Sequence, residues 1–165
     1  MSNITNLLDR EKVEFKVFEA AGKVSSDLNY EAYAVGGYVR DAILGKPSPE
    51  KYTDIDITVR GDFMNFAKCL AKELKINTIV PFENFKTARL VEKEFQIEIA
   101  ETRKESYYKD SRKPLVESTT LEEDLLRRDF TINAIAMSLN KKDFGEIIDP
   151  LGGIKDLNKG IIITP

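Results

Sequence analysis

The segment KYTDIDITVRGD, residues 51–62, predicts a buried strand with two acidic residues on one face. Every second residue is apolar and β-branched, as is typical of a strand that contributes to a core: Ile55, Ile57 and Val59. Asp54 and Asp56 alternate with them, and side chains two positions apart on a strand point the same way, about 6.5–7 Å apart. Two like charges so placed repel one another unless a cation lies between them.

The pair Asp54 and Asp56 is predicted to bind Mg²⁺, a hard cation that usually takes one or two protein carboxylates together with water and phosphates. Such a site can hold two ions, which activate an attacking hydroxyl and stabilise a departing pyrophosphate. The alternative for an isolated Asp-x-Asp is a solvated strand end at which Asp54 caps a turn. The neighbouring motifs bear on this choice.

Composition restricts the chemistry that this chain can perform. Its 165 residues are 42% hydrophobic with a net charge of −3, which suits one domain with its own core and indicates no general basic field for nucleic acid. It has no His, so His-based catalysis and His-ligated metals are excluded. The single Cys69 lies in an apolar helical stripe and is expected to be a buried structural thiol. The charged N-terminus and the lack of a membrane-spanning run predict a cytoplasmic protein.

The order of the predicted elements indicates an α/β (α+β) fold with one mixed sheet and helices packed mainly on one side. Helices are expected at residues 5–29, 36–45, 62–75, 120–130 and 131–140, and strands at 32–35, 54–60, 77–82, 86–93 and 95–102. Asp62 is a predicted N-cap, and Thr120 with Glu123 forms a capping box. Residues 103–119 are charged without a clean period and are expected to form a mobile loop. A strand, a turn, a short helix and an apolar stretch are expected over residues 145–163.

The segment AVGGYVRD, residues 34–41, runs from a strand through two glycines into a helix. Gly36 and Gly37 allow close approach of the backbone, and the free N–H groups that follow suit a phosphate. Arg40 adds a planar donor fork for the same phosphates. The alternatives are an ordinary tight turn and an Asp41 that pairs with a nearby Arg.

Two further segments carry candidate polar residues. In FQIEIAETR, residues 95–103, Glu98 lies between two isoleucines of a predicted strand and therefore needs a partner for its charge. A metal ion bound at Asp54 and Asp56 would supply that partner. The alternative is that Glu98 faces solvent on an edge strand. Arg103 follows and is predicted to reach triphosphate oxygens, the alternative being an ordinary loop Arg.

The segment LLRRDFTINAIAM, residues 125–137, crowds polar residues against an apolar run: Arg127, Arg128, Asp129 and Asn133. Asn133 is one helical turn beyond Asp129, so the two are expected to face one ligand, such as a sugar hydroxyl and a base edge. A surface salt-bridge cluster is the alternative.

Together these motifs resemble the class II tRNA nucleotidyltransferases, which are the CCA-adding enzymes and their bacterial poly(A) polymerase relatives. The motifs in chain order are VGGYVRDAILG, the Asp54-x-Asp56 pair, LEEDLLRRDFTINAIAM and GEIIDPLGGIKDL. The resemblance covers residues 30–160 and implies the DNA polymerase β-like nucleotidyltransferase fold.

The resemblance also implies roles for individual residues. The triphosphate is held by Gly36, Gly37, Arg40 and Arg103. The catalytic Mg²⁺ ions are held by Asp54 and Asp56, with Glu98 at the position where the superfamily often carries a third acidic residue. The ribose is recognised by Arg128, Asp129 and Asn133. A hinge toward a neck domain corresponds to Asp149, Pro150, Gly152 and Gly153. The segment 103–119 corresponds to a flexible loop that assists the final addition of A.

The implied reaction is template-free nucleotidyl transfer from ATP or CTP to the 3′ end of a tRNA or another RNA, with release of pyrophosphate. The family's base-reading Glu-Asp-x-x-Arg motif lies in the neck, and this chain ends at IIITP before it. We therefore expect residues 1–165 to form the head domain, with residues 145–165 leading toward a neck, and the isolated chain not to be fully active. The alternatives are a poly(A) polymerase, an A-adding or CC-adding variant, a transferase that modifies a protein or small molecule, and a nucleotide-binding domain without activity.

Overall fold

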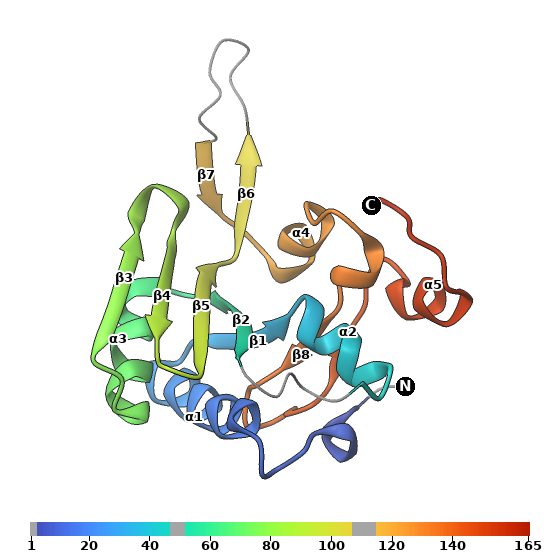
Figure 1. The fold of residues 1–165 in the computed structure, drawn as a ribbon. Helices are drawn as coiled ribbons and strands as arrows, with labels where there is room; N and C mark the ends of the chain where they lie inside the picture. The colour runs from blue at the N-terminus through green and yellow to red at the C-terminus, as the bar shows by residue number, and fades with distance from the viewer. Residues whose placement is uncertain (1–2, 47–51, 107–114) are drawn as a thin grey trace.

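The computed structural model describes residues 3–46, 52–106 and 115–165, and its centre is a seven-stranded mixed sheet (Figure 1). The strand order is β3-β4-β5-β2-β1-β8-β9. The strands are β1 (Glu31–Val35), β2 (Thr53–Arg60), β3 (Thr78–Phe82), β4 (Thr87–Val91), β5 (Phe95–Glu101), β8 (Ala136–Ser138) and β9 (Ile147–Ile148). β2 and β5 are parallel, and the other neighbours are antiparallel. The predicted mixed sheet is confirmed.

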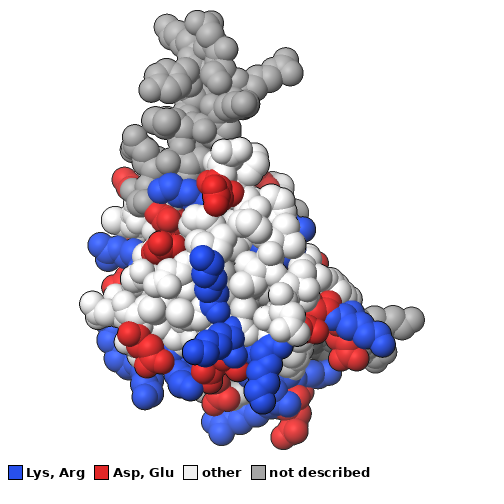
Figure 2. Space-filling model, turned by 90° about the vertical axis from the view of Figure 1, so that its left-hand side faces the viewer, with Lys and Arg blue, Asp and Glu red and all other residues white. Residues whose placement is uncertain are grey.

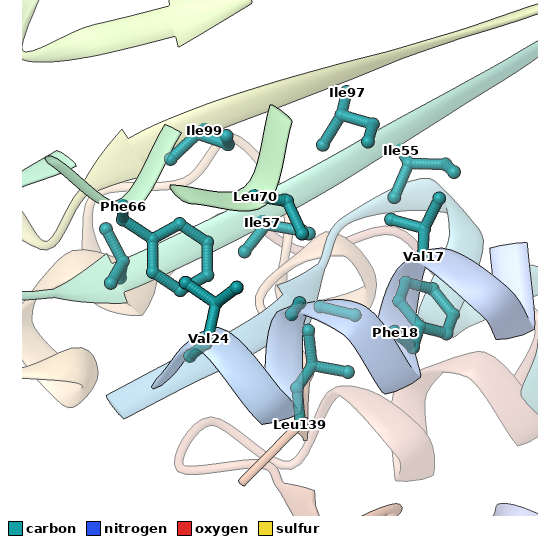
Figure 3. Packing of buried hydrophobic residues seen from close by; sticks show 14 of the residues in the cluster. Val17, Phe18, Val24, Ile55, Ile57, Phe66, Leu70, Ile97, Ile99 and Leu139 are labelled. Carbon is teal, nitrogen blue, oxygen red and sulfur yellow. The ribbon is translucent and has the colours of Figure 1, made fainter. Parts of the chain in front are cut away.

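The two long helices cover one face of this sheet. They are α1 (Val13–Leu28) and α3 (Phe63–Leu74), and the shorter helices are α2 (Gly37–Ile43), α4 (Leu121–Leu126) and α5 (Gly153–Lys159). Figure 3 shows side chains of α1 and α3 packed against the same faces of β2 and β5, among them Phe18, Phe66, Ile55, Ile57 and Ile97. Because successive strand residues point to opposite faces, the alternate positions of β2 and β5 point away from this core.

A smaller apolar cluster lies on the other face, where α4 packs. Leu121 and Leu125 of α4 contact Val35 of β1 and Ala136 of β8, whose chain neighbours Ala34 and Met137 belong to the main core. α4 therefore covers the β1 and β8 side of the second face, next to the acidic positions of β2.

The start of α3 shows how local sequence fixes a helix. The Asp62 carboxylate accepts hydrogen bonds from the backbone N–H groups of Met64 and Asn65, both at 2.9 Å, as predicted for an N-cap. The helix ends at Lys75, which has φ 59°. Cys69, predicted to be a buried structural thiol, packs against the main core but is only partly buried.

Two of the predicted helices are correct only in part. The helix expected at residues 120–130 is shorter, because α4 ends at Leu126. The helix expected at residues 5–29 begins only at Val13, and Thr5–Leu7 forms the separate 3-10 helix η1. Asp9 accepts a hydrogen bond from the backbone of Glu11 at 3.0 Å, which favours a turn over a helix at this point. Ile4 is fully buried and its N–H donates to the Gly145 carbonyl, so tertiary contacts fix this segment.

The helix expected at residues 131–140 is wrong. The structure has a 3-10 helix η3 (Thr131–Asn133) followed by strand β8. Residues 134–137 are all fully buried because their alternate side chains enter the two apolar clusters. A short, continuously apolar run is compatible with either a helix or a buried strand, and here pairing with β1 and β9 decides.

The segment 103–119, predicted as a loop, contains regular structure. β6 (Arg103–Ser106) and β7 (Leu115–Ser118) form a two-stranded antiparallel ladder that projects from the sheet in Figure 1. The remainder of the predicted loop lies outside the described residues, as does most of the loop expected at residues 46–53. Across the described parts of the chain, none of the helices has both the length and the apolar character needed to span a bilayer.

Candidate active site

The acidic residues of β2 lie on the face that α1 and α3 leave open. Asp54 and Asp56 are exposed, whereas the intervening Ile55 and Ile57 are each 1% exposed. In the parallel register of β2 and β5, Asp56 lies opposite Glu98. β5 lies between β2 and β4, so the edge-strand alternative for Glu98 is wrong. The structure thus brings three carboxylates to one face of two adjacent strands.

Neighbouring strands supply partners for two of these carboxylates. Arg89 of β4 donates to the Glu98 carboxylate at 2.8 Å, and the side-chain amide of Gln96 donates to Asp54 at 2.7 Å. Sequence reasoning missed Arg89 and Gln96, although both alternate with apolar residues on their strands. Their significance depends on the strand register, which the sequence did not specify.

Asp56 carries charge that its protein neighbours do not balance. Although the Asp56 side chain is exposed to the cavity, the surrounding walls remove part of its water, which raises the pKa of its carboxyl group; the negative charges of Glu98 and Asp54 raise it further, while Arg128 and Arg89 oppose them. A cation between Asp54 and Asp56 would relieve this repulsion, so the residues present fit a divalent ion. Among the described residues, no group of three or more acidic, Cys or His side chains is arranged to hold a metal by itself.

The turn at Gly36 and Gly37 lies beside the carboxylates of Asp54, Asp56 and Glu98, which we call the acidic row. Gly36 has φ +76°, and a β-carbon built on it would lie 3.1 Å from the Asp56 carboxylate and 3.8 Å from the Arg128 guanidinium. Only a residue without a side chain fits this position without strain. The turn after β1 therefore brings backbone, Asp56 and Arg128 together, as a phosphate-binding arrangement requires.

Arg40 connects α2 to the segment after α4. Its guanidinium donates to the Asn133 side-chain oxygen at 2.8 Å and to Asp41 at 2.9 Å. The alternative predicted for Asp41, a pair with a nearby Arg, is thus observed. Asp129 and Asn133 do not lie one turn apart on a helix, because α4 ends at Leu126 and Asn133 lies in η3.

A buried carboxylate that sequence reasoning missed organises the arginines. Asp124 of α4 is 0% exposed. It accepts from the backbone N–H of Arg103 at 3.1 Å, from the Arg127 guanidinium at 2.8 Å and from the Arg128 guanidinium at 3.4 Å. The available signal was the spacing of three and four residues to Arg127 and Arg128. The salt-bridge alternative is thus observed in part: Arg127 and Arg128 are partly exposed and pair with Asp124, but the carboxylate at the centre is buried.

These elements enclose a cavity of about 340 Å³. Eight of the ten predicted site residues line it: Gly36, Gly37, Asp56, Glu98, Arg103, Arg128, Asp129 and Asn133. Asp54 lines an adjoining cavity of about 500 Å³ that shares Gly37 and Asp56. Arg40 reaches the site through Asn133. The Arg103 guanidinium donates to the carbonyl of Phe85, which ends the 3-10 helix η2 (Glu83–Phe85) between β3 and β4.

Comparison with known proteins gives the family context of this site. A family model described as "Poly A polymerase head domain" matches residues 32–163. The chain is 44% identical over 131 residues to an A-adding tRNA nucleotidyltransferase of Aquifex aeolicus, covering 79% of this chain and 15% of that protein. It is 39% identical over 142 residues to the protein of the same description from Geobacter sulfurreducens, covering 86% of this chain and 16% of that one.

Solved structures agree with this result. A CCA-adding enzyme in an apo form superposes with a TM-score of 0.83 at 38% identity, covering 98% of this chain and 38% of that chain. The Thermotoga maritima CCA-adding enzyme in complex with tRNA_CCA gives a TM-score of 0.78 at 36% identity, covering 98% and 35%. The chain therefore spans between 15% and 38% of the length of these four proteins.

Proposed function

Because the chain belongs to the poly A polymerase head domain family, we propose that it carries the nucleotidyl-transfer site of a tRNA nucleotidyltransferase. The observation that carries the proposal is that the Gly36 turn, the Asp56 carboxylate and the Arg128 guanidinium lie close together at one wall of the cavity. This arrangement places hydrogen-bond donors for a phosphate beside carboxylates that are suited to a divalent ion.

In the proposed reaction, the 3′-hydroxyl of an RNA attacks the α-phosphorus of a nucleoside triphosphate. A new phosphodiester bond forms and the hydroxyl proton passes to water, while the bond between the α-phosphorus and the bridging oxygen breaks and pyrophosphate leaves with the bond electrons. Asp54 and Asp56 would hold Mg²⁺, which when bound supplies charge stabilisation for the attacking and departing oxygens. Positioning and electrostatics account for most of the catalysis at such phosphoryl centres.

The remaining residues are proposed to bind the nucleotide. The backbone at Gly36 and Gly37 approaches the phosphates, and Arg128, Arg103 and Arg40 supply guanidinium donors. Asp129 and Asn133 are proposed to bind the ribose. Since Asn133 already accepts a hydrogen bond from Arg40, its oxygen is fixed in orientation, and its amide N–H groups are directed to other acceptors.

The relatives indicate which substrates to test. Solved neighbours include a CCA-adding enzyme in complex with ATP, one in complex with CTP and one in complex with tRNA. We propose ATP and CTP as nucleotides and the 3′ end of tRNA as acceptor. We further propose that residues 1–165 act as a head domain whose residues 145–165 lead toward a neck, so that transfer by this chain alone is slow.

The test is Mg²⁺-dependent transfer of labelled ATP or CTP to tRNA that lacks its terminal three nucleotides. Asp54→Ala and Asp56→Ala should each reduce transfer by at least about 10³-fold, since several kcal/mol of charge stabilisation are lost. Asp27→Ala, an exposed substitution on α1, serves as the control. Unchanged labelling by Asp56→Ala contradicts the proposal, and label that appears on protein in a cell extract favours a protein-modifying transferase.

A further inference from the structure

Asp124 is a charged residue that the proposed reaction does not use directly. Its side chain is completely buried beneath the cavity wall, on α4. Burial of a carboxylate is costly unless it is paired and hydrogen-bonded. Both of its oxygens have partners, and all three partner residues line the cavity: Arg103, Arg127 and Arg128.

The contacts of Asp124 fix these three residues in different ways. One oxygen accepts from the Arg127 guanidinium at 3.1 and 2.8 Å and from the backbone N–H of Arg103 at 3.1 Å. The other accepts from Arg128 at 3.4 Å. Because Arg103 begins β6, the same carboxylate also joins α4 to the base of the β6–β7 ladder.

Arg128 carries the effect of Asp124 to the acidic row. Its guanidinium lies 3.8 Å from the β-carbon position of Gly36, and the Asp56 carboxylate lies 3.1 Å from the same position. The Nε atom of Arg128 is buried and has no hydrogen-bond partner among the described residues. A buried donor without an acceptor is costly, so an incoming acceptor at this wall would be stabilised.

We infer that Asp124 is a positioning residue that holds the cavity's arginines in the geometry that binds a nucleoside triphosphate. The guanidinium groups of Arg127 and Arg128 repel each other, and the buried Asp124 carboxylate both offsets this repulsion and fixes their orientation, while it fixes Arg103 through the backbone. The inference rests on the proposed function for its ligand. Asp124 itself neither lines the cavity nor contacts the acidic row.

The main test uses Asp124→Asn, which keeps the size of the side chain but removes its charge and replaces one acceptor oxygen by a donor that faces guanidinium donors. At 20 °C, where circular dichroism must show a folded chain, the affinity for Mg²⁺–ATP should fall at least about tenfold. Asp124→Glu, which retains the charge, should lose less. The matched control is Asp143→Asn, which alters a carboxylate that accepts a hydrogen bond from Ser138 at 2.6 Å. It should change the affinity less than twofold.

A second measurement needs no nucleotide. The Nε–H of Arg127 is shared between the buried Asp124 carboxylate and the Arg103 backbone carbonyl, each at 3.1 Å, so its NMR signal should exchange slowly with water in the wild-type chain and faster in Asp124→Asn. A folded Asp124→Asn that binds Mg²⁺–ATP within twofold of wild type overturns the inference, and so does an Arg127 Nε–H that exchanges equally fast in Asp124→Asn and in wild type. A wild-type chain that binds neither ATP nor CTP overturns the proposed function instead, while faster Arg127 exchange in Asp124→Asn than in wild type would still establish that Asp124 holds Arg127.

Discussion

Asp56 is the residue at which the charges of the site are least balanced. Its pKa in the folded chain is raised first by the partial loss of water at the cavity wall and next by Glu98. A carboxyl group whose pKa is raised on folding binds its proton more tightly in the native state. Its contribution to stability is therefore fully present below the ordinary Asp pKa, about 3.9, and is lost as the pH rises through the raised value.

It follows that Asp56→Asn should raise the thermal midpoint of the metal-free chain at pH 7. The gain should disappear below about pH 4, where Asp56 is protonated in both states. Thermal unfolding followed by circular dichroism across this pH range measures the effect, with Asp27→Asn on the exposed face of α1 as control. A midpoint at pH 7 equal to or below that of wild type would show that Asp56 is not under electrostatic strain.

Gly36 permits a second residue-scale comparison, because Gly160 has nearly the same backbone conformation in an open setting. Their φ values are +76° and +68°, and a β-carbon at Gly160 meets nothing within 4 Å. Gly36→Ala and Gly160→Ala should each lose about 1–2 kcal/mol of unfolding free energy in chemical denaturation. Only Gly36→Ala, which crowds Asp56 and Arg128, should also weaken nucleotide binding. Equal nucleotide affinity in the two variants would argue against a binding role for the turn.

At the scale of elements, α3 is expected to contribute to the stability of the fold without affecting nucleotide binding. Asp62 caps this helix through two backbone N–H groups on the face opposite the cavity. Asp62→Ala should cost about 1 kcal/mol of unfolding free energy. Nucleotide affinity measured by calorimetry below the unfolding transition should stay the same. A large loss of affinity would indicate that α3 is coupled to the site through the sheet.

The elements that sequence reasoning predicted well are those whose signals are local. β2 and β5 show alternation on their strands, and α3 has both a cap and an apolar stripe. β8 was mistaken for a helix because its fully buried run has no period, and its conformation is decided by pairing with β1. The ladder of β6 and β7 was missed for the same reason, since charged residues without a period give no strand signal.

The same distinction applies to the site. Residue types and motif order identified most of the cavity wall, and the family resemblance supplied the roles that remain proposals. Asp124, Arg89 and Gln96 were missed because their importance arises from partners on other elements. A buried position in α4 and a facing position on β4 depend on tertiary packing and strand register, which single-residue patterns do not encode.

For the molecule as a whole, the fold places its core and its chemistry on opposite faces of one sheet. α1 and α3 cover one face, and the acidic row lies on the other beside α4. Basic and acidic side chains are interspersed on the side that carries β3 and α3 (Figure 2), in keeping with the net charge of −3. A strong electrostatic grip on RNA is therefore not expected from that side.

The cavity walls predict weak discrimination between bases by this chain. The residues proposed to bind a nucleotide face its phosphates and ribose, which ATP and CTP share. Affinities for the two, compared by competition in the presence of Mg²⁺, should agree within about tenfold, or 1.4 kcal/mol. A much larger preference for either nucleotide would mean that the described residues read the base.

The most direct test of the account is where a divalent ion binds when a nucleotide is present. Mn²⁺ can replace Mg²⁺ in small amounts, and its paramagnetism broadens the amide NMR signals of residues close to it. With ATP present, we predict the strongest broadening at Asp54 to Asp56 and at Gly36 and Gly37, and its loss at these residues in Asp56→Asn. Broadening centred on other acidic residues, or unchanged by Asp56→Asn, would contradict the assignment of this carboxylate pair.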